Sequence, residues 1–204
     1  MAGTSPAMTS NETPPMAAPK ILVLPGTARI GSNNIKLAAL AVKELTLIDA
    51  EVTRISLSDY PLPIYEDDLE SRTGPPANAV RLKQMMMAHQ GVLITSPEYS
   101  ASVTPLLKNA IDWVSRMKDQ PFKEKPVAIQ SASQGPLGGA RMQYHWRMSM
   151  TFLAAFIFGT PEVFIGLAQT KFDKDTLELK DQPTKDAIKA QLAAFSKFIE
   201  RVKA

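Results

Sequence analysis

Short apolar runs alternate with longer amphipathic stretches along most of this chain. Residues 20–24 form the first apolar run, and Pro25-Gly26 ends it, as expected of a buried parallel strand. The next stretch begins at Ser32 or Asn33, either of which can cap a helix, and its apolar residues recur at helical spacing. Continued to the C-terminus, the pattern predicts strands at 20–24, 51–57, 91–96, 127–131 and 162–166 and helices at 33–45, 79–89, 103–117, 139–158 and 183–202.

Two segments stand outside this alternation. Residues 60–76 are rich in proline and acids, so we predict a long loop there. Residues 1–19 are rich in Pro, Thr, Ser and Ala and lack the basic start and apolar centre of a secretory signal. We expect them to form a disordered N-terminal extension. Residues 20–204 are then expected to fold as one domain with a sizeable core.

Alternating strands and helices are typical of an α/β protein whose parallel sheet is covered by helices on both faces. Five strands fit the flavodoxin-like three-layer sandwich, with the strand order 2-1-3-4-5. In that fold a ligand binds beyond the carboxyl ends of the first and third strands, where the strand order reverses. We predict this fold and a ligand site at that edge. The helix at 103–117 is expected to turn Leu106, Leu107 and Ala110 inward.

Composition narrows the chemistry that such a site can perform. The absence of cysteine excludes disulfides, thiolate metal sites and cysteine nucleophiles, including cysteine-based phosphatase loops. Two histidines among 204 residues argue against a histidine-rich metal site, and we assign no metal ligand. The net charge is +3 without a dense basic run, which argues against nucleic-acid binding. No apolar run approaches a membrane span, so we expect a cytoplasmic protein.

Three polar loops each follow a predicted strand. The first surrounds one arginine with hydroxyls and amides at the start of a helix, which suits a phosphate group. An ordinary helix cap beside a solvent-facing arginine is the alternative. The residues of this loop that we assign to cofactor binding are Thr27, Arg29, Ser32, Asn33 and Asn34.

The second and third loops suit a flat ring. An acid stands beside an aromatic residue in the second loop, and glycine in the third allows the backbone to approach a planar ligand. A plain surface turn and a flexible connection are the alternatives. The residues assigned to cofactor binding are Pro97, Glu98, Tyr99 and Ser100 in the second loop and Ser133, Gln134 and Gly135 in the third. Together the three loops indicate a site for flavin mononucleotide (FMN).

Four motifs extend this interpretation. They are Gly-Thr-Ala-Arg-Ile-Gly-Ser-Asn-Asn at 26–34, Thr-Ser-Pro-Glu-Tyr-Ser at 95–100, Leu-Lys-Asn-Ala-Ile-Asp-Trp at 107–113 and Gly-Gly-Ala-Arg-Met-Gln-Tyr-His at 138–145. With these four motifs in this order, the chain resembles the NAD(P)H-dependent FMN reductases of the flavodoxin-like proteins. More narrowly, it resembles the bacterial chromate and quinone reductases. The resemblance covers about 20–202. Departures are Thr27 for the usual Ser, Ser100 for the usual Asn and Ala132 for a common hydroxyl residue.

The resemblance implies an FMN-dependent oxidoreductase. It would take electrons from NADPH or NADH and pass them by a ping-pong mechanism to quinones or to similar acceptors such as chromate, flavins, azo compounds or nitro compounds. The flavin N5 carries the chemistry in this family, so no catalytic side chain is assigned. The resemblance further implies a homodimer or homotetramer in which Arg141 and Tyr144 frame a neighbouring chain's substrate pocket. Polar residues in the first turns of a helix are the alternative for these two.

Two other functions stay open at this stage. A flavodoxin-type carrier would pass single electrons between protein partners, although the basic sequence pI of about 9.1 argues against it. A flavin-free binding protein could retain the same fold, although the phosphate loop argues against this. The motif at 107–113 is predicted to be structural, because its residues suit packing and capping better than catalysis.

Overall fold

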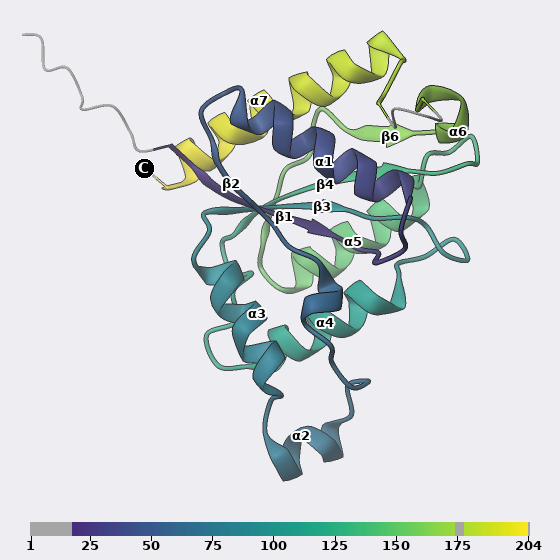
Figure 1. Ribbon diagram of the computed structural model, residues 1–204. Coiled ribbons are helices and arrows are strands. Elements are labelled where there is room, and N and C mark those ends of the chain that lie inside the picture. Colours follow the sequence, from purple (N-terminus) through teal and green to yellow (C-terminus); the bar gives the residue numbers. More distant parts are fainter. Residues whose placement is uncertain (1–17, 174–177, 204) are drawn as a thin grey trace, which may run out of the picture.

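The computed structural model describes residues 18–173 and 178–203, so most of the predicted N-terminal extension, at 1–17, lies outside the described residues. A parallel sheet lies between two layers of helices (Figure 1). Its order, β2-β1-β3-β4-β5, confirms the predicted fold, and β6 also pairs with β4. The strands are β1 (Lys20–Pro25), β2 (Glu51–Arg54), β3 (Gly91–Thr95), β4 (Pro126–Ala132), β5 (Phe156–Ile157) and β6 (Val163–Ile165).

Helices cover both faces of this sheet. One face carries α1 (Asn33–Thr46) and α7 (Gln182–Lys203), with the short α6 (Ala168–Lys171) beside them. The other face carries α3 (Ala77–Met87), α4 (Pro105–Arg116) and α5 (Ala140–Phe152). Among the described residues, no helix combines the length and the apolar character needed to cross a membrane.

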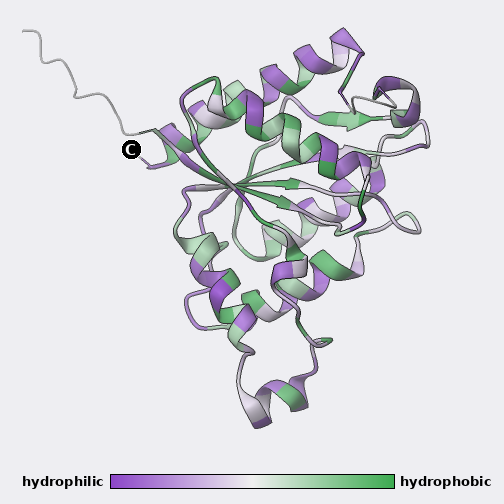
Figure 2. Ribbon diagram, in the orientation of Figure 1, coloured by the Kyte–Doolittle hydropathy of each residue, from purple (hydrophilic) through white to green (hydrophobic). Residues whose placement is uncertain are grey.

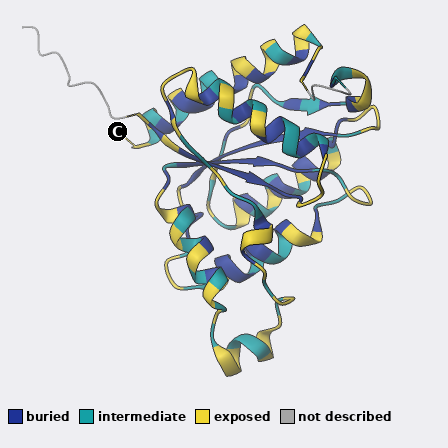
Figure 3. Ribbon diagram, in the orientation of Figure 1, coloured by how far each residue is buried: buried dark blue, intermediate teal, exposed yellow. Residues whose placement is uncertain are grey.

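Alternate residues of each central strand supply the two cores. In β1, Ile21 packs with α1 and α7, whereas Leu22 packs with α3, α4 and α5. Every residue of β3 and β4 is buried, which is why each strand contains a short continuous apolar run. Figure 2 shows the hydrophobic central strands, and Figure 3 shows the same strands as the buried layer. The parallel register brings the ends of β1, β3 and β4 together.

Two predicted boundaries and the predicted burial of one residue are wrong. The helix expected at 139–158 ends at Phe152, because Ala154 takes a left-handed backbone conformation (φ 58°) and the chain then joins β4 as β5. The second strand ends at Arg54 rather than at 57, and a 3-10 turn follows at Leu57–Asp59. Leu106, expected to face inward, is 39% exposed.

The segment predicted as a long loop contains a further helix, α2 (Asp67–Thr73), that projects from the body (Figure 1). The base of the projection is tied to α4. Asn109 accepts from the backbone N–H of Tyr65 at 2.8 Å and donates to the carbonyl of Pro63 at 2.9 Å. Trp113 donates its indole N–H to the same carbonyl at 2.8 Å. The motif at 107–113 therefore has a structural role, as predicted.

Candidate functional site

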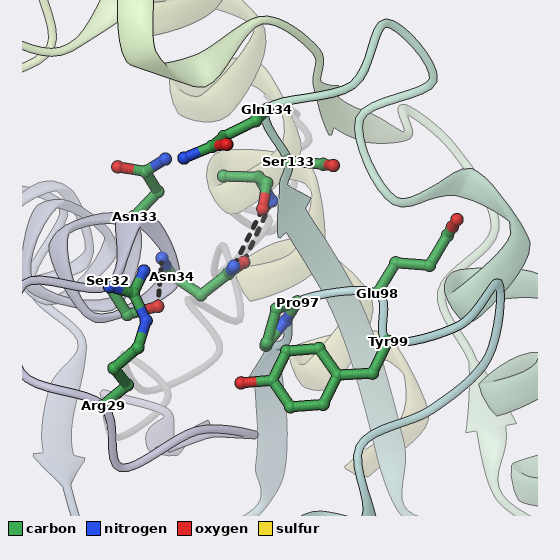
Figure 4. Close-up of a pocket in the computed structure, with 10 residues that line it drawn as sticks. Arg29, Ser32, Asn33, Asn34, Pro97, Glu98, Tyr99, Ser133 and Gln134 are labelled. Atoms are coloured by element: carbon green, nitrogen blue, oxygen red, sulfur yellow. Dashed lines mark hydrogen bonds between the residues drawn. The ribbon is translucent and has the colours of Figure 1, made fainter.

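A cavity of about 290 Å³ opens where the three predicted loops meet, at the carboxyl ends of β1, β3 and β4 (Figure 4). It is lined by Arg29, Ser32, Asn33, Asn34, Pro97, Glu98, Tyr99, Ala132, Ser133 and Gln134. The sequence predicted all of these except Ala132, which carries no polar side chain that could have marked it. Three other predicted residues, Thr27, Ser100 and Gly135, lie in the same loops but outside the lining.

The start of α1 forms the cationic end of the cavity. Ser32 caps the helix, since its hydroxyl accepts from the backbone N–H of Asn34 at 3.3 Å. Within 18–173 and 178–203, the backbone N–H of Asn33 has no acceptor and Arg29 forms no ion pair. The first turn of α1 also contains no acidic residue. The free N–H of Asn33, the helix dipole and an unpaired guanidinium together fit a phosphate dianion.

Asn34 connects two parts of the fold. Its side chain is 1% exposed and makes two hydrogen bonds of 2.9 Å with the backbone of Ala132, one donated and one accepted (Figure 4). These bonds fasten the first turn of α1 to the end of β4. One side-chain amide hydrogen of Asn34 is not used in these two bonds and could still donate to a phosphate. A contact between Asn34 and phosphate therefore stays a prediction. Thr27 supports the same loop, because its hydroxyl accepts from the backbone N–H of Arg29 at 3.2 Å.

A tight turn shapes the second loop. Tyr99 and Ser102 exchange two backbone hydrogen bonds, of 3.0 and 2.9 Å. Ser100 and Ala101 between them have φ values of 47° and 58°, in the left-handed region that most residues avoid. Tyr99 is 45% exposed at the edge of the cavity, and its ring faces the side that carries Arg29 (Figure 4).

Glu98 lines the cavity, but its carboxylate is bound to α5. One oxygen accepts from the backbone N–H of Met142 at 3.2 Å, and the other lies 3.6 Å from the guanidinium of Arg141. Ser102 adds a second link to α5 through a 2.9 Å hydrogen bond with the ring of His145. Both bonds fix the position of the second loop. Arg141 and Tyr144 are themselves exposed and lie outside the cavity lining.

The third loop depends on glycine. The hydroxyl of Ser133 accepts from the backbone N–H of Gly135 at 3.2 Å and tightens the turn after β4. Gly138 follows with a φ of 62°, and a Cβ there would lie 2.7 Å from the backbone of Phe164 and Ile165. Only glycine combines this conformation with so close an approach. The loop is therefore held against β6.

The cavity thus combines a cationic end, suited to an anion, with an aromatic residue opposite it. Its volume of about 290 Å³ lies just below the roughly 300–1,000 Å³ typical of small-molecule sites. A planar ligand anchored at α1 would extend past the exposed Tyr99. The fold is flavodoxin-like, and the cavity lies at the switch point of its sheet, where such folds bind their ligands.

Comparison with known proteins gives the family. Residues 19–170 match the model of the family described as NADPH-dependent FMN reductase. Over 185 residues the chain is 42% identical to a quinone reductase of Escherichia coli. The aligned region covers 90% of this chain and 97% of that protein. An NAD(P)H-dependent FMN reductase of Pseudomonas aeruginosa is 37% identical with the same coverage. The chain belongs to the NADPH-dependent FMN reductase family and is an FMN-dependent oxidoreductase that uses a nicotinamide nucleotide.

Solved structures agree with this assignment. The flavoenzyme NAD(P)H:(acceptor) oxidoreductase FerB of Paracoccus denitrificans superposes with a TM-score of 0.78 at 29% identity, covering 90% of this chain and 98% of that one. A flavodoxin of Pseudomonas aeruginosa superposes with a TM-score of 0.54 at 15% identity, which shows the fold alone.

Proposed function

We propose that this protein passes electrons from NADPH or NADH through FMN to small-molecule acceptors, of which quinones are the principal class. The observation that carries the proposal is the cavity that places Arg29 and the start of α1 opposite Tyr99. Two relatives support the acceptor class: the quinone reductase of Escherichia coli and an NAD(P)H:quinone oxidoreductase of Solanum tuberosum, which is 36% identical. Chromate, other flavins, azo compounds and nitro compounds are further candidate acceptors.

The residues of the cavity bind and orient. Bound FMN supplies a two-electron redox centre between the nicotinamide and the acceptor. Arg29 and the backbone N–H of Asn33 would hold its phosphate, and Pro97 and Tyr99 would orient the ring. Glu98 keeps the second loop in place through α5, so this orientation is preserved between turnovers. No side chain is assigned a proton-transfer step.

We further propose that bound FMN would leave one ring face open, so that donor and acceptor bind there in turn. The nicotinamide must leave before the acceptor can reach the same side, which is a ping-pong order. Initial rates at several fixed acceptor concentrations are expected to give parallel double-reciprocal lines. Intersecting lines would contradict the shared site.

A second copy of the chain is expected beside this site. Phe152 on α5 is 89% exposed, and Met148 and Tyr144 on the same helix are exposed too. A cavity of about 540 Å³ between α4 and α5 includes Met148 and Phe152 in its lining. Exposed apolar residues grouped in this way are typical of a protein interface. We infer a homodimer or homotetramer that brings Arg141 and Tyr144 near a neighbouring site, and Phe152→Glu is expected to shift the mass measured by light scattering to that of one chain.

The direct test is an absorbance spectrum of the full chain, supplemented with FMN, desalted and then mixed with NADPH without oxygen. We expect flavin bands that survive desalting and bleach on addition of NADPH. Bound flavin that neither NADPH nor NADH reduces, together with a stable one-electron-reduced flavin on titration, would favour a flavodoxin-type electron carrier. Absence of bound flavin would refute the proposal.

Arg29→Ala tests the phosphate site. Loss of a charge-assisted hydrogen bond is expected to weaken FMN about 10- to 100-fold in a calorimetric titration. Arg72→Ala, at an exposed position in α2, removes the same charge far from the cavity and is the matched control. Equal FMN affinity of the two variants would show that Arg29 does not hold the phosphate.

A further inference from the structure

A second cavity, of about 590 Å³, begins at the same end of α1 and lies between α1 and α7. These helices run side by side, with α6 close to the start of α1 (Figure 1). Ser32 lines both cavities. Gly31 lines the second, and a Cβ added there would meet no atom within 4 Å. The two cavities therefore adjoin at the proposed phosphate site, and the space beside Gly31 is open.

The second cavity has apolar walls and a cationic rim. Ile35, Leu40 and Phe172 supply apolar surface. Four lysines and two glutamates also line it, which leaves an excess of positive charge: Lys36, Lys43, Lys185 and Lys189, with Glu44 and Glu178. Such a lining suits an anion that also carries a flat apolar group.

Lys36 is the cation closest in sequence to the phosphate site. It lies one helical turn after Ser32, since its backbone N–H donates to the Ser32 carbonyl at 3.1 Å. Its ammonium group lies 5.6 Å from the centre of the Phe172 ring. A charge and a largely buried aromatic ring therefore stand together just beyond the point where the FMN phosphate is expected to bind.

We propose that this second cavity holds the adenylate half of flavin adenine dinucleotide (FAD), so that the protein accepts FAD as well as FMN. The inference rests on the proposed function, because it starts from the phosphate position at α1. FAD adds one phosphate and one adenosine to the FMN phosphate. Lys36 meets the added phosphate, and the adenine lies among Leu40, Phe172 and the lysine stems. The volume of 590 Å³ falls within the range of small-molecule sites.

Calorimetric titration of the flavin-depleted full chain with FMN and with FAD tests the inference. FAD is expected to bind with a dissociation constant within about tenfold of that of FMN. Lys36→Gln is expected to weaken FAD about tenfold through the loss of one charged contact, with FMN changed less than about threefold. Lys197→Gln, exposed on α7 and outside the cavity lining, is the matched control and leaves both affinities unchanged.

A second variant fills the cavity and removes no charge. Ala39 is exposed on α1 and lines the cavity, so Ala39→Phe is expected to exclude the adenylate and spare FMN. Binding of FAD more than about 100-fold weaker than FMN would overturn the inference. Equal effects of Lys36→Gln and Ala39→Phe on both flavins, or no effect on either, would overturn it as well. Binding of FMN without FAD refutes this inference alone, whereas binding of neither flavin refutes the proposed function.

Discussion

Replacing Asn34 by alanine separates the structural role of this residue from a binding role. The Asn34 side chain makes two hydrogen bonds of 2.9 Å to Ala132, and these are contacts between segments 98 positions apart. Alanine removes both partners at once. The N–H and the carbonyl of Ala132 then stay buried without them, because Ala132 itself is 3% exposed.

The magnitude follows from the burial of these groups. A buried donor or acceptor left without a partner costs about 1–3 kcal/mol, and two such groups in one place are not fully additive. We therefore expect Asn34→Ala to lower the free energy of unfolding by about 2–4 kcal/mol. Asn33→Ala is the matched control, since Asn33 lines the same cavity and its side chain makes no hydrogen bond within the described residues. Its expected effect on stability is below about 0.5 kcal/mol.

Urea unfolding of the flavin-free chain, followed by circular dichroism, measures both variants. The flavin must be absent, because a ligand that binds only the folded state adds its own stabilisation. Adding FMN afterwards reports binding for each variant separately. A loss below about 1 kcal/mol for Asn34→Ala, or an equal loss for Asn33→Ala, would refute the reasoning.

The remaining predictions concern backbone strain and a buried charge. Gly138→Ala is expected to cost about 2–4 kcal/mol in thermal unfolding, and Gly74→Ala, with a similar φ of 71° and open space around it, about 1 kcal/mol; equal losses would contradict the clash. The double change Ser100→Asn and Ala101→Gly suits the left-handed turn and is expected to raise stability by about 0.5–1.5 kcal/mol, whereas a lower melting temperature would count against it. Burial and the nearby Lys203 lower the pKa of Lys125 to about 8. Above that pH the unfolded chain binds more protons than the folded chain, so the folded state gains stability as the pH rises. The free energy of unfolding of the wild type relative to that of Lys125→Met should rise by about 1 kcal/mol between pH 7.5 and 9.5. A difference that does not change with pH would be inconsistent with the lowered pKa.

The spacing of apolar residues was sufficient to predict the helices and strands that bury one or both faces. The runs that became β1, β3 and β4 are buried on both faces, and α1, α4 and α7 each bury one face, so apolar spacing marked all six. The helix α2 escaped prediction because none of its residues is buried, and it therefore leaves no apolar period in the sequence. The end of α5 was missed for another reason. Ala154 reverses the chain without a glycine or proline, and the apolar residues after it looked like more helix.

The residues of the site were also predicted only in part. Residue types and their place after strands were enough to predict most of the cavity lining. The sequence did not show which atoms were already engaged. The Asn34 amide is held by Ala132 and the Glu98 carboxylate by α5, and both depend on contacts between distant segments that no local pattern records.

The fastening of residues 63–65 to α4 has a practical consequence. Asn109 and Trp113 bind the backbone at Pro63 and Tyr65, so hydrogen bonds to α4 fix the base of the projection to the body. Nothing lies within 4 Å of a Cβ added at Gly74, at the end of α2. The tip of the projection is therefore a suitable insertion site. A reporter peptide or a whole domain inserted there is expected to leave the sheet and the cavity at its edge unchanged.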